Sequence, residues 1–489
     1  TNKQMSELHK DIVRRRYVEY LDECKGDSFS GQSMRILMVS ESIPPQVNGI
    51  ARRVAHYRES LEKLGHDVTL VAPGSKHCWD YPNIWNEGNK FMILKPSFLM
   101  DALMRGQEYD VVHCVMPLNV MSFLLLAALK LNRIMNENQG PHLIVSWHCN
   151  LADYSRKYLP HWLGNTMVYQ CAGPLRVLAD LADRLLVPTF STEPDVSCAF
   201  GRSRIGICKT GIEVNRFNPD LKNSPHGLLW QQRRIEDLKR FGDKKHLLLY
   251  VGRLAQEKGM SSIMHSMQEL QKDCVLWIVG DGPIRTALEQ EARELKLPVV
   301  FWGFQRGEAL HSVYTVADCF VSGSTTETFG QTINEALASG ILASIPRSPG
   351  FKDAYTHLID PEKFMWEPND QDDMVRTIRR TLNEGKVVDR ARLENWDQAT
   401  SHLAEEYSSS KFRDHGVKGL LHVFTWLWFL VILTTIATQL NYLVRKALKF
   451  VGFSEKYAVL GATLATMAGS TCVIWSVVTY LFHCVLHFM

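Results

Sequence analysis

The chain has 489 residues, of which 45% are hydrophobic and 22% are charged, so it can form several domains with a sizeable core. This composition excludes a disordered, collagen-like or disulfide-scaffold protein. Lys and Arg total 55 against 52 Asp and Glu, and the resulting net charge of +3 gives no reason to expect nucleic acid as a partner. The 11 cysteines include no C-x-x-C pair, which favours a reducing compartment.

Short apolar runs alternate with helical stretches through the first half of the chain. Residues 1–33 are expected to form a helical extension and a linker. Strands are then expected near 35–39, 68–72, 110–113, 142–147 and 184–187. Because strands that alternate with helices form parallel sheets covered on both faces, we expect a doubly wound, Rossmann-like domain over 34–217.

The same alternation returns in the second half. A polar stretch at 218–245 is interpreted as a linker. Strands are expected at 246–251, 275–279, 317–321 and 341–345, with helices from about 260 and over 329–339. These elements predict a second Rossmann-like domain over 246–390. Two such domains place a cleft between the carboxyl ends of their sheets, where ligands of doubly wound folds bind.

The tail has a different composition. Residues 420–438 contain His422 as their only ionisable group, and 457–482 form a second apolar run. Each run is long enough to span a bilayer, so 418–489 are expected to form a hairpin of two transmembrane helices. The alternative is a pair of buried core helices. Basic residues flank the first run on both sides, so its orientation stays open.

The turn after the first strand ends in Asn48 and Gly49 and opens a helix. Backbone amides at such a helix start can meet a phosphate. The turn lacks the G-x-G-x-x-G spacing, which disfavours a nicotinamide or flavin dinucleotide. An ordinary strand-to-helix turn would look the same.

Two cations follow the strand at 246–251. Arg253 and Lys258 lie at its carboxyl end, where they could neutralise a diphosphate. The alternative is a solvated loop with surface charges. A Gly-Asp-Gly-Pro run at 280–283 is expected to form a tight turn.

A carboxylate-rich motif precedes and enters the helix at 329–339. Glu327, Thr328, Phe329 and Gly330 lead into this helix, and Glu335 lies about two turns inside it. Backbone amides beside carboxylates suit an anionic or hydroxyl-rich ligand. Helix capping by Glu327 with a solvated Glu335 is the alternative.

His148 ends the strand at 142–147, at the same sheet edge as Gly49. A structural and a catalytic role are equally open for this histidine.

Together these motifs resemble the retaining glycosyltransferases of the sucrose-synthase and mannosyltransferase-like family, which have the GT-B fold. The resemblance extends over about 35–407. It implies that the first domain binds the acceptor and the second a sugar nucleotide, and that 391–412 form a helix crossing back to the first domain. Within the family the chain looks closest to the sulfoquinovosyltransferases, through Ser146-Trp-His148 and the run 209–213.

The resemblance also implies roles for individual residues. Arg253 and Lys258 would hold the donor diphosphate, and Glu327 would lie beside the donor sugar. His148 would contact the sugar near the reacting carbon, and these four are the catalytic candidates. Glu335 would bind the ribose hydroxyls.

The remaining substrate contacts are implied at the two helix starts: Asn48 and Gly49 at the distal phosphate, and Thr328, Phe329 and Gly330 at the donor. No metal and no cofactor are implied, because the nucleotide sugar is a substrate and the cations neutralise its diphosphate.

The activity implied is retaining transfer of sulfoquinovose from UDP-sulfoquinovose to diacylglycerol, by an integral membrane protein of the plastid envelope. Residues 341–350 replace the glycine-rich stretch usual in the family, which leaves the donor sugar open. The alternatives are a UDP-glucose or GDP-mannose donor with a lipid- or glycan-linked acceptor in an endomembrane. A non-catalytic membrane protein that binds sugar nucleotide is a third reading.

Overall fold

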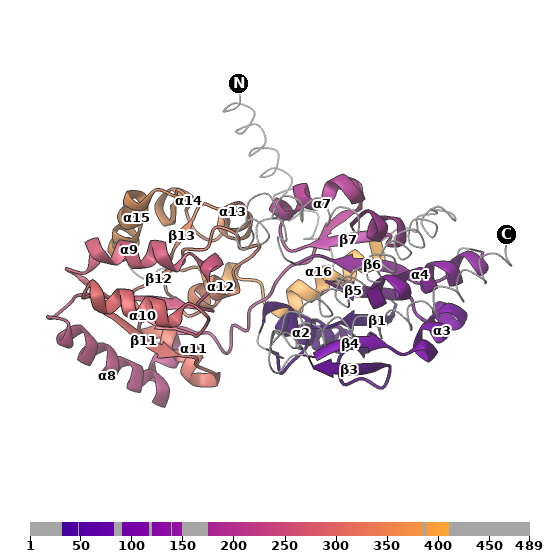
Figure 1. Cartoon of the computed structure of the whole chain (residues 1–489), viewed down its shortest axis with the longest axis horizontal. Helices are drawn as coiled ribbons and strands as arrows, with labels where there is room; N and C mark the ends of the chain where they lie inside the picture. Colours follow the sequence, from indigo (N-terminus) through magenta and orange to yellow (C-terminus); the bar gives the residue numbers. More distant parts are fainter. Residues whose placement is uncertain are drawn as a thin grey trace, which may run out of the picture.

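The computed structural model of the chain describes residues 32–46, 48–82, 90–116, 120–137, 139–148, 175–384 and 388–409. These residues form two lobes side by side, each with a central sheet between helices (Figure 1). Nearly all of the predicted N-terminal extension and the whole predicted hairpin at 418–489 lie outside the described residues. Within the ranges given, no helix combines the length and the apolar composition that crossing a membrane requires.

The first lobe contains a six-stranded parallel sheet in the order β2-β1-β5-β6-β7-β8. Its strands are β1 (Arg35–Ser40), β2 (Asp67–Val71), β5 (Val111–Val115), β6 (His142–Ser146), β7 (Arg184–Val187) and β8 (Ile205–Ile207). Most strand residues are buried, as expected for strands covered on both faces. The doubly wound arrangement predicted for this half is confirmed.

Helices cover both faces of this sheet. They are α2 (Gly49–Lys63), α3 (Pro96–Arg105), α4 (Val120–Met135) and α7 (Glu193–Phe200), and β3 (Cys78–Pro82) and β4 (Lys90–Leu94) form a separate hairpin. The middle of α4 is wholly apolar, and Leu124, Leu125 and Leu126 are fully buried. This helix is therefore part of the core of the lobe.

The second lobe repeats the plan with the strand order β11-β10-β9-β12-β13-β14. Its strands are β9 (His246–Val251), β10 (Cys274–Val279), β11 (Val299–Gly303), β12 (Cys319–Val321), β13 (Ala343–Pro346) and β14 (Met365–Trp366). Its helices are α9 (Met260–Leu270), α10 (Arg285–Glu294), α11 (Gly307–Val316), α12 (Gln331–Ala338), α13 (Pro349–Tyr355), α14 (Pro361–Phe364) and α15 (Gln371–Glu384). The strand order reverses between β9 and β12, and ligands of such sheets bind at that point.

The segment 218–245, predicted as a linker, belongs instead to the second lobe. It contains a short 3-10 turn and the helix α8 (Pro225–Arg240), which packs on α11. Trp230 is buried, lies 5.5 Å from Trp277 and 4.9 Å from Trp302 between ring centroids, and donates to the carbonyl of Ala309. The prediction was wrong because most of the outer face of this helix is polar and one tryptophan makes the principal core contact.

The last described helix returns to the first lobe. Helix α16 (Trp396–Ser409) packs against α2 and β8, and Figure 1 shows it within the right-hand lobe. The indole of Trp396 stacks on His56 at 4.5 Å, and Ser60 donates to Asp397 over 2.7 Å. The final part of the described chain thus joins the lobe formed by its beginning.

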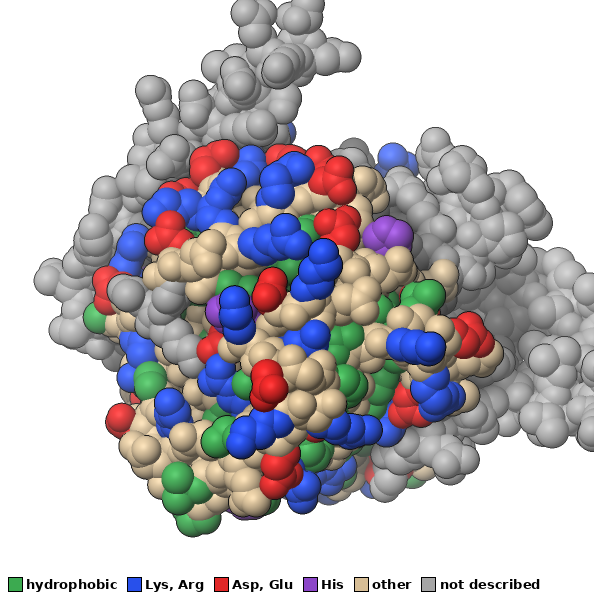
Figure 2. Space-filling model, turned by 90° about the vertical axis from the view of Figure 1, so that its left-hand side faces the viewer, with side chains coloured by type: hydrophobic (Ala, Val, Ile, Leu, Met, Phe, Trp, Pro, Cys, Tyr) green, Lys and Arg blue, Asp and Glu red, His purple; other side chains and the backbone are tan. Residues whose placement is uncertain are grey.

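Basic and acidic side chains are interspersed on the end of the second lobe that faces away from the first (Figure 2). Pairs between residues of the same helix in the second lobe include Arg233 with Glu236 on α8 and Arg376 with Asp373 on α15. Exposed pairs of this kind add little stability and are typical of a solvated surface.

Candidate active site

The two lobes meet at the carboxyl ends of their sheets. The hydroxyl of Thr328 donates to the carbonyl of His148 over 3.2 Å, and the hydroxyl of Thr189 donates to the carbonyl of Thr328 over 3.0 Å. Gln331 donates to the carbonyl of Gly211 over 3.3 Å. The loop that enters α12 therefore lies directly against the first lobe, and the structure brings His148 and Thr328 together.

Lys258 and Glu327 form an ion pair at the point where the strand order of the second sheet reverses. Lys258 ends a short 3-10 turn after β9, and Glu327 lies on the loop between β12 and α12. Their side chains are 22% and 25% exposed, so both remain accessible to a ligand. The pair orients a partly exposed ammonium group at the carboxyl end of the sheet, where it can meet an anion.

The loop of Lys258 depends on glycine at a close backbone approach. Gly259 has a φ of 66°, and a Cβ there would lie 1.9 Å from the carbonyl oxygen of Gly323. A Cβ on Gly280 would lie 1.9 Å from the carbonyl oxygen of Gly252. The three loops after β9, β10 and β12 are thus packed backbone against backbone, which explains the glycines in these motifs.

Arg253 is exposed on the same loop, and its carbonyl accepts a hydrogen bond from the Tyr250 hydroxyl over 3.0 Å. Among the described residues its guanidinium forms no ion pair, so it is available to a solvent-borne anion.

Glu335 is not solvated, so the alternative of a glutamate side chain that faces solvent at this position is wrong. Its residue is 1% exposed, Arg52 of α2 donates to Oε1 over 2.6 Å, and the Tyr314 hydroxyl donates to Oε2 over 2.7 Å. The pKa of Tyr314 lies well above its usual value, chiefly because the residue is buried and secondly because the Glu335 carboxylate is close. The carboxylate therefore links the two lobes through a partly buried contact that spans 283 positions of sequence.

His148 is buried, and its Nε2 lies 2.9 Å from the hydroxyl of Ser146. Burial holds the pKa of His148 well below its usual value, and the nearby Arg53 and His113 lower it further. The ring is therefore neutral at physiological pH and is able to form hydrogen bonds but not ion pairs.

Asn48 caps α2, because its side-chain oxygen accepts from the amide of Ala51 over 2.8 Å. Gly49 is the first residue of that helix, and a Cβ added to it would meet no atom within 4 Å. The turn thus has the geometry of an ordinary helix start, with open space beside Gly49. The phosphate contact at these two residues stays a prediction.

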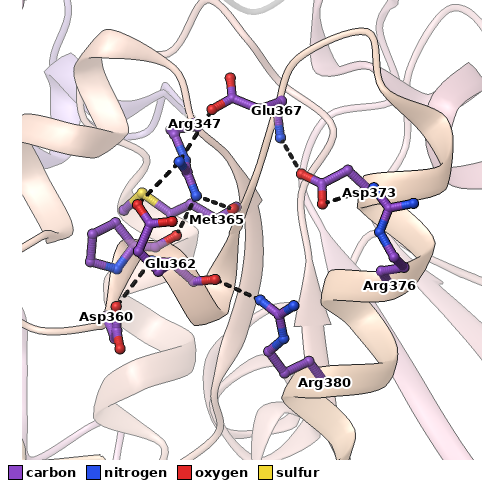
Figure 3. Close-up of polar contacts among 9 residues, drawn as sticks. Arg347, Asp360, Glu362, Met365, Glu367, Asp373, Arg376 and Arg380 are labelled. Atoms are coloured by element: carbon purple, nitrogen blue, oxygen red, sulfur yellow. Dashed lines mark hydrogen bonds and ion pairs between the residues drawn. The ribbon is translucent and has the colours of Figure 1, made fainter.

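Figure 3 shows the polar contacts of Arg347, which lies in the unusual stretch 341–350. The guanidinium of Arg347 donates to the carbonyls of Pro361 and Met365 and pairs with Glu362 and Glu367, the latter two at 3.2 Å. Arg347 is thereby committed to the α14–β14 region rather than to the cleft.

The helix that follows this stretch supports the loop of Glu327. The Tyr355 hydroxyl donates to the carbonyl of Gly330 over 2.7 Å. A Cβ on Gly350 would lie 2.1 Å from the carbonyl oxygen of Glu327. Phe329 packs beside Tyr355, with ring centroids 5.8 Å apart. Helix α13 thus sets the position of the predicted donor loop.

Sequence reasoning missed Arg52, Tyr314 and Asp353. Arg52 had a visible signal, since it lies one turn after Gly49 on the predicted helix. Tyr314 lies in an apolar stretch of α11 and gave none. Asp353 of α13 accepts from the amide of Ser191 in the first lobe, and burial raises its pKa to about 6.

Across the described ranges, no cluster of three or more His, Cys, Asp or Glu side chains has an arrangement that could hold a metal ion.

Two family models match the chain, one for each lobe. Residues 231–399 match the model described as glycosyl transferases group 1, and residues 47–216 match glycosyltransferase family 4. Each lobe therefore matches a glycosyltransferase family model, the second lobe that of group 1. The cleft between the lobes is therefore the place to look for its chemistry.

Several curated proteins are similar over most of the chain. A GDP-mannose-dependent alpha-mannosyltransferase of Mycobacterium tuberculosis is 29% identical over 66% of this chain and 82% of its own. A sulfoquinovosyl transferase of Arabidopsis thaliana is 28% identical over 78% of this chain and 75% of its own. An alpha-monoglucosyldiacylglycerol synthase of Acholeplasma laidlawii is 24% identical over 68% of this chain and 83% of its own.

Solved structures share the fold. The catalytic domain of starch synthase IV of Arabidopsis thaliana aligns with a TM-score of 0.54 at 14% identity, over 78% of this chain and 99% of that one. The HepE protein of Anabaena aligns with a TM-score of 0.51 at 16% identity, over 77% of this chain and 100% of that one. The predicted two-domain GT-B fold is confirmed.

Proposed function

We propose that the protein transfers a sugar with retention from a nucleotide donor, bound by the second lobe, to a membrane lipid. The observation that carries this proposal is the placement of the Lys258–Glu327 pair. It lies where the strand order of the second sheet reverses, on a loop whose Thr328 contacts His148 of the first lobe.

Cations at this position stabilise a leaving diphosphate. As the bond from the anomeric carbon to the phosphate oxygen breaks, negative charge grows on the diphosphate, and Lys258 and the exposed Arg253 can meet it. Side chains fixed before the reaction are most effective in this role, and Glu327 holds Lys258 in place. No metal ion is needed for this neutralisation.

In a retaining transfer the acceptor hydroxyl attacks the anomeric carbon from the side that the diphosphate leaves. A new carbon–oxygen bond forms to the acceptor, and the hydroxyl proton passes to an oxygen of the departing phosphate. The protein then needs no separate general base. A neutral His148 beside the reacting carbon suits this scheme, because a cation there would oppose the positive charge developing on the sugar.

The ribose role proposed for Glu335 requires an exchange of partners. Both of its carboxylate oxygens already accept hydrogen bonds, from Arg52 and from Tyr314. A ribose diol would replace Arg52, whose side chain is 37% exposed and can move into solvent. Binding of the donor would then break the Arg52–Glu335 contact between the lobes.

We propose diacylglycerol as the acceptor and UDP-sulfoquinovose as the donor. The names of the Arabidopsis and Acholeplasma relatives support sugar transfer to a lipid, and the predicted apolar hairpin at 418–489 would hold the enzyme at its acceptor. The name of the mycobacterial relative favours GDP-mannose as a second candidate donor, and that of the Acholeplasma protein favours a glucosyl donor.

An assay of the detergent-solubilised full chain with diacylglycerol liposomes tests this proposal. UDP-sulfoquinovose, UDP-glucose and GDP-mannose are supplied in parallel, and lipid products are identified by mass spectrometry. An anionic sulfolipid formed only with the first donor is the expected result. A neutral glycolipid formed with another donor would retain the lipid glycosyltransferase and reject the sulfoquinovose assignment.

A further inference from the structure

A line of buried hydrogen bonds leads from the crossover helix to the cleft. The Tyr407 hydroxyl on α16 lies 2.7 Å from Nδ1 of His113, and Nε2 of His113 lies 2.8 Å from the hydroxyl of Ser146. That hydroxyl lies 2.9 Å from Nε2 of His148. All four residues are buried, with exposed fractions between 0% and 9%.

The parallel sheet explains this arrangement. Ser146 is the last residue of β6 and His148 lies two positions beyond it, with the two side chains in hydrogen-bond contact. His113 lies on the neighbouring strand β5, where it pairs with Ile144 in register and shares the face of Ser146. Helix α16 covers the same face and brings Tyr407 to His113, with ring centroids 5.7 Å apart.

The direction of these hydrogen bonds follows from counting donors. Both imidazoles are neutral, since burial lowers the pKa of His113 to about 3 and holds that of His148 well below its usual value. Each ring therefore carries one N–H, and the Ser146 hydroxyl has one proton to give. The line can run from Tyr407 to His148 or in the opposite sense.

In the forward sense Tyr407 donates to Nδ1 of His113, Nε2–H of His113 donates to Ser146, and Ser146 donates to Nε2 of His148. The proton of His148 is then on Nδ1, an atom with no hydrogen-bond partner among the described residues. In the reverse sense the buried Tyr407 hydroxyl has no acceptor there, because His113 is its only partner in the described part of the chain. Nδ1 of His148 would then also remain without a donor.

An orphaned buried donor is costly, and a ligand in the cleft can accept from His148 but cannot reach Tyr407. The forward sense is therefore favoured. Resting on the glycosyl transfer proposed above, we propose that Ser146 and His113 are positioning residues that fix the Nδ1–H tautomer of His148, with Tyr407 donating to His113 at the far end of the line. This tautomer presents an N–H donor to an acceptor oxygen of the bound sugar nucleotide.

The test reads the tautomers of His113 and His148 in the full chain labelled with ¹⁵N-histidine in detergent micelles. Long-range nitrogen–proton correlation spectra distinguish the two neutral tautomers, and spectra of His113→Gln and His148→Gln assign the signals. This readout needs no substrate. We expect Nδ1–H at His148 and Nε2–H at His113 in the wild type.

Ser146→Ala removes the hydroxyl that bonds to Nε2 of His148. Neither nitrogen of His148 then has a partner among the described residues, so nothing selects Nδ1–H, and we expect the Nε2–H form of His148 to rise to about half of the population. The value of kcat should fall about twofold with it, whereas a loss of packing alone would leave the tautomer unchanged. Tyr57→Phe is the matched control, because it removes another buried hydroxyl that bonds to the Lys209 carbonyl and not to this line.

An Nε2–H tautomer at His148 in the wild type would overturn the proposal, as would a wild-type tautomer ratio in Ser146→Ala. If the lipid assay gives no product while the tautomers are as expected, the proposed function is rejected and the role of the hydrogen-bond line in fixing the tautomer is retained.

Discussion

The Arg52–Glu335 contact should respond very differently to loss of its two partners. The Glu335 side chain is 2% exposed, whereas that of Arg52 is 37% exposed. In Arg52→Met a buried carboxylate keeps only the Tyr314 hydroxyl, and stranding a buried charge costs about 3–5 kcal/mol. Opening of the cleft lets water reach the carboxylate, so we expect the lower end, about 3 kcal/mol.

Glu335→Gln should cost less. The glutamine oxygen can still accept from Tyr314, and Arg52 can turn to solvent or to Glu213, which lies 3.5 Å from it. We expect a loss of about 1 kcal/mol. The difference between the two variants is then about 2 kcal/mol, or about 30-fold in an opening equilibrium.

Hydrogen exchange measured by mass spectrometry on peptides covering α12 would report this difference locally, because amide exchange follows the free energy of opening. Arg58→Met is the matched control on α2. It removes an exposed ion pair with Glu62 and should change protection by less than about 0.5 kcal/mol. Equal protection in Arg52→Met and Glu335→Gln, or greater loss in the latter, would refute the reasoning.

Three further outcomes are expected. Lys258→Met should lower kcat/KM in the lipid assay by about 100-fold, because it removes charge stabilisation at the leaving diphosphate. The control Lys363→Met breaks a surface ion pair in the same lobe and should leave kcat/KM near the wild-type value. Gly259→Ala should destabilise the second lobe by about 3 kcal/mol in urea unfolding, because its Cβ would meet a backbone carbonyl at 1.9 Å, whereas Gly242→Ala, at a φ of 98° with open space, should cost about 1 kcal/mol. Burial raises the pKa of Asp353 from 3.8 to about 6, so the folded protein holds this proton where the unfolded chain releases it, and stability falls as pH rises from about 4 to about 6. Asp353→Asn should therefore show a smaller drop in urea midpoint over that interval, and an unchanged drop would count against this assignment.

The sequence was most informative where a local pattern decides local structure. Buried strands such as 246–251 read as continuous apolar runs because both faces of a parallel sheet are covered. The carboxyl-end placement of Lys258 and Glu327 followed from the same alternation, and the structure joins them in an ion pair. Helix α8 was missed because most of its residues are polar and its buried contact with the core depends on one tryptophan, Trp230.

Contacts across long sequence separations could not be predicted from one chain. Arg52 and Glu335 are 283 positions apart, and the Tyr407–His113 bond spans 294. Each depends on how α2 and α16 pack against sheets and on how the lobes meet, which no local pattern records. The solvated alternative for Glu335 failed for this reason, since an isolated glutamate on a helix gives no sign of a partner from another lobe.

The anomeric configuration of the glycolipid formed by the full chain would test the account most directly. Proton NMR of the extracted product, made from a donor of known configuration on diacylglycerol liposomes, reads that configuration from the coupling of the anomeric proton. The account predicts a lipid product with the configuration of the donor. A product of opposite configuration would contradict retention at this cleft, and the absence of any glycolipid with all three donors would contradict the lipid glycosyltransferase itself.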